Sequence, residues 1–429
     1  MHGTQRRSGG YQALLVGLLS LNFGIVFFDR NSLNFLMPFV QPELGLSNSQ
    51  VGAIAGIFSF TWALAAFGIS RLSDMIGNRK LLLVIATLAF SACSFLTGLA
   101  STFAMMIGAR ILMGIAEGGV MPISHAMVAS EVEPKWRGLA QGIAQNFGSN
   151  FFGSFVAPVV LVALASEYGW RNAFYIAGVP GIISAMLILF LLKEPEPAKA
   201  SEAEVFSDQP VPATPVGADS RGWFAPFWEA LQVRNVAICV FMGIVLVAYL
   251  VICWAFMPLY LTQVRGFSQT ETSWLMGTLG ISATIGSFVV AGLSDMIGRR
   301  PVMIVCTFAS LLLPLGALYY DGSVWVLAAI FFFGWALNGI FPLFMATVPS
   351  ESVPPAMAAT VFGLCMGSCE ILGGAAGPFI AGIAADAYGL AAPLWIMAGL
   401  TFAGGLAALL LQETAPRVLE ARGLTRSAS

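Results

Sequence analysis

Five ionisable residues lie inside long apolar segments, where a charge is costly. Asp29 and Arg30 are neighbours within residues 13–38, Arg110 and Glu117 lie within 103–129, and Glu370 lies within 358–384. A charged side chain at the centre of a bilayer costs about 2.5–3.5 kcal/mol even on the most lenient insertion scale. Adjacent helical residues point about 100° apart, so Asp29 and Arg30 do not neutralise each other. We therefore expect these groups to form a polar site inside a bundle of membrane helices.

The residue types and their spacing suggest anion binding and proton transfer. Arg110 and Glu117 are two helical turns apart and share a face. Counted from the outer ends of their segments, Arg30 and Arg110 lie at a similar depth, about 10–12 Å down at 1.5 Å per residue. Two guanidinium groups at one level suit a carboxylate ligand, and carboxylates beside them can take up and release protons. In the alternative interpretation, some of these charges are ion bridges that hold helices together.

The composition indicates the elements that must position these residues. The chain has 429 residues, of which 58% are hydrophobic and only 10% are charged, with a mean hydropathy of +0.83. A soluble domain carries about 25% charged residues. The long apolar runs therefore predict an all-α membrane protein with twelve transmembrane helices. The predicted spans are 13–38, 49–70, 81–100, 103–129, 139–165, 172–193, 235–260, 271–291, 302–320, 323–346, 358–384 and 392–412.

The twelve spans divide into two pseudo-symmetric six-helix halves. The motif Leu72–Gly77 recurs as Leu293–Gly298, at an offset of 221 residues (293 − 72). A fixed offset over six spans indicates a duplicated unit. The segment 193–229 is rich in Pro, Glu and Ser and cannot bury a core. We predict an N-terminal half at 1–192, a linker at 193–229, a C-terminal half at 230–413 and a tail at 414–429.

Lysine and arginine residues predict the orientation in the membrane. With the N-terminus inside, the outer loops hold only Arg171 and Arg265, and Arg30 and Arg110 lie within spans. The inner segments hold all the others of the 20 basic residues. This bias predicts a cytoplasmic linker and cytoplasmic termini in a multi-pass protein of the cell (inner) membrane.

Two further pairs of residues join the candidate substrate site. The repeat places Asn150 opposite Glu370 (370 − 220 = 150), so spans five and eleven are expected to turn polar residues toward the cleft between the halves. Trp62 and Trp254 are candidates for the cavity wall. For Asn150 the alternative is an ordinary interhelical hydrogen bond, and aromatic residues in membrane helices often serve packing only.

The duplicated loops between spans two and three of each half are predicted to be conformational gates. Each contains an acidic residue, a glycine and basic residues at fixed spacing, and an acidic residue can cap the next helix or pair with a base. Glutamates at the inner ends of spans four and ten are expected to supply partners. The predicted gating residues are Asp74, Arg79, Lys80, Asp295, Arg299, Arg300, Glu131 and Glu351.

The sequence offers little support for an enzyme. No phosphate-binding loop, Ser-His-Asp order or zinc-ligand spacing occurs, so neither a cofactor nor a metal is expected. The six cysteines all fall inside apolar runs and are expected to act as small hydrophobic residues. The formal net charge of −2 does not point to nucleic acid. The expected partners are a small organic anion, protons and the lipid bilayer, and a monomer is expected.

The duplicated loops Asp74–Lys80 and Asp295–Arg300, with Gly169-Trp170-Arg171, resemble the signature loops of the major facilitator superfamily. Within it, residues 28–33 (Phe-Asp-Arg-Asn-Ser-Leu) and 108–118 are similar to the anion:cation symporter family. The resemblance implies proton-coupled uptake of an organic anion, such as a sugar acid or aromatic acid, by alternating access. It implies substrate binding at Arg30 and proton coupling at Asp29, with Arg110 and Glu117 linking protonation to substrate.

Two departures from the family pattern bear on the substrate. Phe27 and Trp62 stand near positions that often hold Tyr, and the loss of two hydroxyls weakens the case for a polyhydroxy sugar acid. Glu370 is outside the general pattern. The alternatives are a drug/proton antiporter, which would not need two deep arginines, and a membrane sensor without net transport, which would usually carry a soluble signalling domain.

Overall fold

The computed structural model describes residues 8–133, 136–195, 225–335, 337–354 and 357–421. Every element assigned within these residues is helical. Twelve of the described helical segments are long and apolar enough to cross a membrane, in the order that the sequence predicts. The prediction of an all-α protein with twelve membrane helices is therefore confirmed.

Six spans come from the first part of the chain. Spans four and five are each divided into shorter helices, and span five contains two π-helical segments, η2 and η3. The elements are α1 (Gly9–Leu44), α2 (Asn48–Ile76), α3 (Arg79–Leu99), α4 (Phe103–Gly118), α5 (Val120–Glu131), α6 (Arg137–Gly142), η2 (Ile143–Phe147), η3 (Ser149–Val156), α7 (Ala157–Tyr168) and α8 (Trp170–Leu191).

The second part repeats this arrangement after a short helix, α9 (Ala225–Gln232). Spans nine to eleven are divided, again with π-helical segments, and a short helix follows the last span. The elements are α10 (Arg234–Gln263), α11 (Gln269–Ile297), α12 (Arg299–Ala309), α13 (Leu312–Tyr319), α14 (Val324–Gly334), α15 (Leu337–Pro342), η5 (Leu343–Thr347), α16 (Val348–Glu351), α17 (Ala358–Ser368), η7 (Cys369–Ala375), α18 (Ala376–Tyr388), α19 (Ala391–Leu409) and α20 (Pro416–Ala421).

Local sequence explains where the second span of each half begins. Ser47 and Ser268 precede α2 and α11, and each forms a capping box with the residue three positions later, Gln50 or Glu271. Such a box satisfies two backbone N–H groups that a helix start otherwise leaves without partners. Gly45 ends α1 at φ +62°, a conformation that glycine adopts without steric cost.

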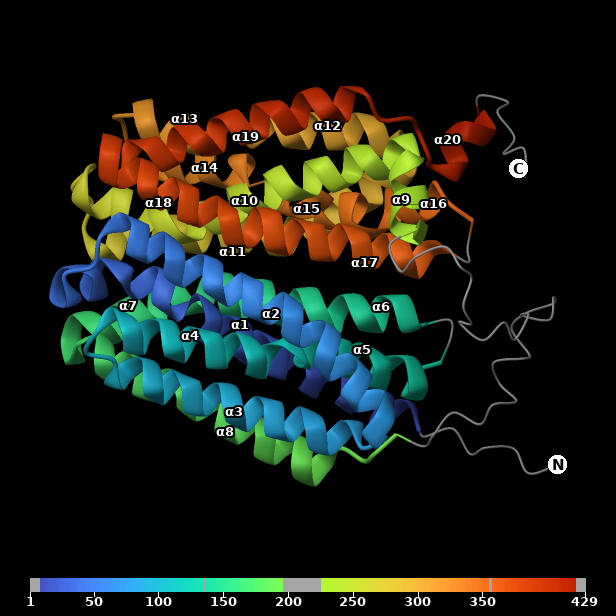
Figure 1. The fold of residues 1–429 in the computed structure, drawn as a ribbon, viewed down its shortest axis with the longest axis horizontal. Coiled ribbons are helices and arrows are strands. Elements are labelled where there is room, and N and C mark those ends of the chain that lie inside the picture. Colours follow the sequence, from blue (N-terminus) through green and yellow to red (C-terminus); the bar gives the residue numbers. More distant parts are fainter. Residues whose placement is uncertain (1–7, 134–135, 196–224, 336, 355–356, 422–429) are drawn as a thin grey trace.

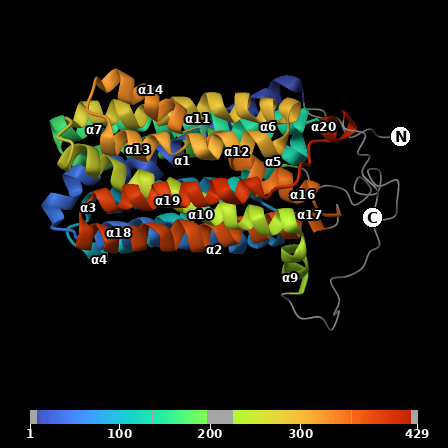
Figure 2. The same ribbon diagram turned by 90° about the horizontal axis from the view of Figure 1, so that it is seen from above.

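The two sets of helices form two layers (Figure 1), and the view from above shows the spans running side by side along the long axis (Figure 2). The layers meet where α2 packs on α18 and η7, where α11 packs on η3 and α7, and where α1 packs on α10. We call the end of the bundle that holds the α1–α2 connection the distal end; α9 and α20 lie at the opposite, proximal end. Much of the segment 193–229 lies outside the described residues, so the exact domain boundaries stay a prediction.

The contact between α2 and the second half is closest toward the distal end. A Cβ atom added at Gly52 would lie 2.1 Å from the Pro378 carbonyl oxygen, and one at Gly56 would lie 2.4 Å from that of Ala375. A Cβ atom added at Gly382 would lie 2.4 Å from the Asn48 carbonyl oxygen. Only glycine permits such an approach of two helix backbones, so the halves are closed against each other along α2.

Candidate functional site

Arg30 of α1 and Arg110 of α4 line the same cavity, as their matching depths predict. The cavity has a volume of about 60 Å³ and lies between the halves, since Val251 and Trp254 of α10 complete its wall. Polar side chains from α1 and α2 also reach it. Its lining residues are Arg30, Asn31, Leu33, Asn34, Ile54, Ala55, Phe58, Ser59, Arg110, Val251 and Trp254.

The guanidinium group of Arg30 is surrounded by aromatic rings. Its Cζ atom lies 5.2 Å from the ring centroid of Phe27, 4.6 Å from that of Phe58 and 5.5 Å from that of Trp62. A cation over an aromatic face is stabilised electrostatically, and more strongly when water is excluded. Trp62 thus packs against Arg30 and is itself 7% exposed, whereas Trp254 lines the cavity.

Arg110 is 3% exposed and only partly satisfied. Its Nη1 atom donates to the Arg30 carbonyl oxygen over 3.2 Å and contacts the Met113 sulfur at 3.3 Å. Its Nε and Nη2 atoms have no hydrogen-bond partner among the residues that the structure describes. Buried donors without partners are costly, so the fork of Arg110 is available to an anionic ligand.

The buried carboxylates lie near the arginines without bridging them. Asp29 accepts a hydrogen bond from Ser94 over 2.6 Å. Among the described residues, its other oxygen and both oxygens of Glu117 have no hydrogen-bond partner. These two acids and the two arginines nevertheless interact electrostatically. No ion pair joins them in the described part of the chain. This arrangement differs from the ion bridges of the alternative interpretation.

Asn150 and Glu370 occupy equivalent places in two π-helical segments. Asn150 is the second residue of η3 and Glu370 the second residue of η7. A π-helical turn inside an α-helix commonly occurs at a functional site. Neither residue lines the cavity of the two arginines. Glu370 is 9% exposed, interacts electrostatically with Arg30, and has one carboxylate oxygen without a partner.

The glycines around Arg110 and Glu117 divide into two kinds. A Cβ atom added at Gly114 would meet the Thr61 hydroxyl at 2.1 Å, and one at Gly118 would meet the Ala66 nitrogen at 2.7 Å. These two glycines let α2 approach α4 closely, as expected from the sequence. Gly108 has open space around it, so close packing does not explain this glycine.

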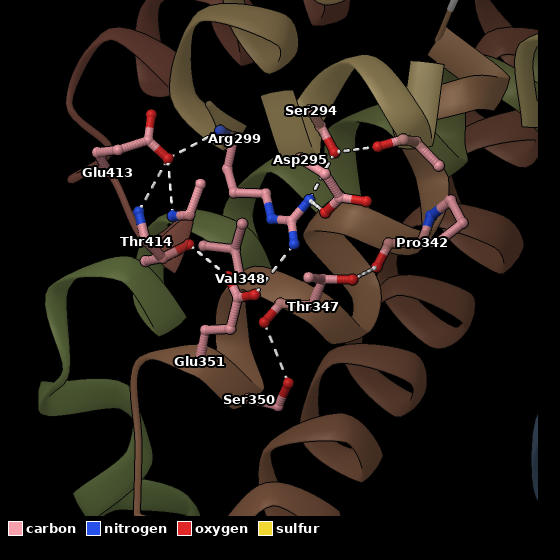
Figure 3. A network of polar contacts seen from close by, with 12 residues as sticks. Ser294, Asp295, Arg299, Pro342, Thr347, Val348, Ser350, Glu351, Glu413 and Thr414 are labelled. Atoms are coloured by element: carbon pink, nitrogen blue, oxygen red, sulfur yellow. Dashed lines mark hydrogen bonds and ion pairs between the residues drawn. The ribbon is translucent and has the colours of Figure 1, made fainter. Parts of the chain in front are cut away.

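A second polar network lies at the start of α12 (Figure 3). Arg299 forms ion pairs with Asp295 and, over 3.2 Å, with Glu351, and it donates to the Ser294 hydroxyl over 2.7 Å. Thr414 donates to the other oxygen of Glu351 over 2.6 Å. The structure thus brings three predicted gating residues of the second half together, on one side of the molecule and within a single half.

A glutamate that sequence reasoning missed caps each third span. Glu413 accepts from the backbone nitrogen atoms of Arg299 and Arg300 over 2.8 and 3.3 Å. Glu194 accepts from those of Arg79 and Lys80 over 2.7 and 2.8 Å. The two glutamates are separated by 219 positions (413 − 194), which is close to the offset of the internal repeat. Their equivalent places in the two halves could therefore have identified them from the sequence. The caps come from these glutamates and not from Asp295.

The remaining predicted gating residues are less fully described. The side chain of Asp74 lies outside the described residues. Arg79 and Glu131 lie at the ends of α3 and α5, on the proximal side of the first half, and Lys80 follows Arg79. Arg300 donates to the Leu409 carbonyl oxygen over 2.8 Å, which ties α12 to α19.

Several residues of the site were not predicted from the sequence. Ser94 holds Asp29, and Asn31 donates to the Gly153 carbonyl oxygen over 3.0 Å, which fixes α1 against η3. Asn34 and Ser59 add polar groups to the cavity. Ser94 belongs to a buried stripe with Thr87 and Ser91 at helical spacing, a pattern that could have indicated a polar face of α3.

Comparisons with known proteins agree with the fold. The chain belongs to the Major Facilitator Superfamily, whose family model matches residues 19–369 and 254–427. A crystal structure of a variant of the nucleoside transporter NupG superposes with a TM-score of 0.75 at 15% identity, covering 93% of this chain and 100% of that one. The protein is therefore a multi-pass membrane transporter.

Three curated relatives show the range of this similarity. A probable sulfoacetate transporter of Cupriavidus necator is 26% identical over 77% of this chain and 75% of its own length. A D-galactonate transporter of Escherichia coli is 25% identical over 96% and 98%. A multidrug resistance protein of Proteus mirabilis, MdtG, is 25% identical over 88% and 91%.

Proposed function

We propose that this protein is a proton-coupled symporter that takes up a small organic carboxylate by alternating access. The observation that carries the proposal is the cavity between the halves, which Arg30 and Arg110 line together while neither forms an ion pair in the described part of the chain. Two cations beside a desolvated space favour an anion, and the planar guanidinium fork matches a carboxylate. The relatives named for sulfoacetate and galactonate are transporters of small acids, which supports this choice.

Proton coupling is assigned to Asp29 and Glu117. Both are almost fully buried, at 0% and 1% exposure, and both have oxygens without partners. A buried carboxylate without a bridge is costly in its charged form, so its proton occupancy responds to a neighbouring charge. A substrate anion on Arg30 and Arg110 therefore changes the proton affinity of the two acids. This change couples substrate transport to proton transport.

The proposal includes an orientation and an assembly. We assign the proximal end and the two chain termini to the cytoplasm, because the basic residues of the sequence concentrate in the segments predicted to be inside. The protein then lies in the cell (inner) membrane, and we propose that it is a monomer. Asn150, Glu370, Trp62 and Trp254 are assigned to the substrate site, and Glu370 is the member from the second half that faces the charge of Arg30.

Uptake by proteoliposomes tests the proposal. A panel of radiolabelled acids is offered with and without a pH gradient, and the amide of each transported acid is added as a competitor. We expect accumulation only with the gradient and no competition by the amide. Arg30→Lys and Arg110→Lys each keep the charge but lose the fork, and each loses a charge-assisted hydrogen bond of about 1.5–3 kcal/mol.

The matched control is Arg265→Lys, because Arg265 donates to the Ala317 and Tyr320 carbonyl oxygens away from the cavity. This variant should retain the affinity of the unmodified protein. Normal affinity in Arg30→Lys and Arg110→Lys, or equal competition by acid and amide, would remove the anion-binding role.

A drug/proton antiporter is the second candidate. It is favoured by the aromatic and aliphatic part of the cavity wall, with Phe58, Ile54 and Trp254, and by the similarity to a multidrug resistance protein. Efflux of a fluorescent cationic dye from the same vesicles separates the two functions. The symporter should not move the dye under either direction of the pH gradient.

A further inference from the structure

A carboxylate of the second half caps the start of a helix in the first half. Asp386 lies in the last turn of α18, and its two oxygens accept hydrogen bonds from the backbone nitrogen atoms of Asn48 and Ser49, over 2.8 and 2.9 Å. These are the first two residues of α2. The contact lies at the distal end, where Gly382 also packs against Asn48.

The contact completes the cap of α2. The Ser47 hydroxyl accepts a hydrogen bond from the nitrogen of Gln50 over 3.2 Å, so Ser47 satisfies the third N–H group of α2. Asp386 serves the first two. A negative charge at a helix N-terminus is stabilised by the helix dipole, and hydrogen bonds to an ionised acceptor are about twice as strong as neutral ones. The first turn of α2 therefore favours closure against α18.

Two further hydrogen bonds extend this contact across the distal end. The Asn48 side chain accepts from Gln41 of α1 over 3.0 Å, and Gln41 accepts from Gln263 of α10 over 3.0 Å. Four spans from both halves are thereby joined through Asp386, Asn48, Gln41 and Gln263. We call this chain of contacts the distal latch.

The pseudo-equivalent crossing is built differently. The counterpart of Asp386 is Ser166 (386 − 220), whose hydroxyl donates to the Val162 carbonyl oxygen of its own helix over 2.9 Å. The first turn of α11 is capped by Ser268 with Glu271, both from its own half. Of these two crossings, only that of α2 with α18 has a carboxylate from the opposite half on a helix start.

We propose that Asp386 is the element of the distal latch that holds the distal end closed, and that its bonds to Asn48 and Ser49 break each time the protein opens on that side. Alternating access in this family requires the halves to separate at one end and then the other. Asp386 is already exposed to water, so separation of α2 from α18 costs chiefly its two hydrogen bonds to the N–H groups of Asn48 and Ser49. The proposal concerns the moving parts and holds for any substrate or coupling ion.

Distance measurements between spin labels test the latch without a substrate. Labels are placed on introduced cysteines at Ser101 and Tyr388, two exposed distal positions in opposite halves, whereas the six native cysteines are buried. We expect Asp386→Ala to raise the population with a longer distance by about three- to fivefold, since two hydrogen bonds to a solvent-exposed carboxylate are lost. Asp386→Asn should give a smaller increase, because one acceptor oxygen remains.

The matched control is Glu271→Ala, which removes a carboxylate from the start of α11 without touching the opposite half. Its distance distribution should equal that of the unmodified protein. The latch is overturned if Asp386→Ala and Asp386→Asn both leave the distribution unchanged, or if Glu271→Ala shifts it equally. Should Asp386→Ala fail to fold, Asp386→Asn alone decides, because it keeps the size and shape of the side chain.

Discussion

Arg30 shows how an expensive charge is held inside a membrane helix. Its guanidinium group rests among Phe27, Phe58 and Trp62 and makes no ion pair in the described part of the chain. Aromatic faces stabilise the cation but do not neutralise it. The rings of Phe27, Phe58 and Trp62 thus hold Arg30 in place and leave its charge without a counter-ion among the described residues.

Removing one of these rings should weaken substrate binding. Trp62→Leu deletes a cation–π contact, which is worth up to about 2 kcal/mol when desolvated. We therefore expect the affinity for the transported acid to fall by about three- to thirty-fold. Trp325→Leu is the control, because Trp325 is 83% exposed and remote from the cavity. The affinity is measured by isothermal titration calorimetry, which does not depend on tryptophan fluorescence. Unchanged affinity in Trp62→Leu would contradict the role of this ring.

The buried acids should separate coupling from binding. Asp29→Asn and Glu117→Gln keep the shape of the side chain but cannot exchange a proton. Uptake driven by a pH gradient should be lost, whereas exchange of internal for external substrate should persist. Glu167→Gln, at an exposed position, serves as the control. The assignment fails if both buried variants still accumulate substrate against its gradient.

The sequence predicted which residues are charged within the membrane but not how they are partnered. The depth of Arg30 and Arg110 follows from counting along helices, and the two do line one cavity. The contact of Asp29 with Ser94 depends on how α3 is rotated about its axis, which the sequence indicates only through the stripe of Thr87, Ser91 and Ser94. Hence the acids and bases were found and their neutral neighbours were not.

At the scale of elements, Glu194 and Glu413 anchor the third span of each half. Each binds the first two backbone nitrogen atoms of that helix from the end of the sixth span. Glu413→Gln should destabilise the second half by about 1 kcal/mol, in the range of helix-cap substitutions. Thermal unfolding in detergent measures this loss, with Glu420→Gln of α20 as a control at an exposed position. Equal melting temperatures for the two variants would exclude the cap's contribution.

The network in Figure 3 permits a separate test of gating. Asp295→Asn weakens the ion pair with Arg299 while Glu351 still holds that arginine. We expect slower switching between inward-open and outward-open states and little change in substrate affinity, and we expect the same of Asp74→Asn in the first half. Transport rates equal to those of the unmodified protein, at equal protein amounts, would argue against a gate.

Span number and order were predictable because a bilayer imposes a length of about 20 apolar residues on each helix. The π-helical segments η3 and η7 were not, because one extra residue in a turn hardly alters the apolar pattern. Asp386 was missed for another reason. It lies near a span end, where an acidic residue resembles any solvated one, and its partners are backbone atoms distant in sequence.

At the scale of the whole molecule, the contacts between the two halves differ in kind from the contacts within a half. Their mutual contacts include the glycine-lined crossing of α2 with α18 and the distal latch. On the proximal side, the hydrogen bonds and ion pairs that Arg299 and Glu413 form with described residues join elements of one half. A rigid half with a separable interface suits rocking of one half against the other.

In each half, a glutamate that follows the sixth span caps the start of the third span. These caps bear on whether the halves need the peptide connection between them. Since Glu194 and Glu413 fasten each half from within, neither half relies on the peptide connection to the other for its own integrity. Residues 1–195 and 225–429, produced as two polypeptides in one cell, should therefore assemble into a functional carrier. Co-purification through a tag on one fragment, followed by uptake assays, measures this.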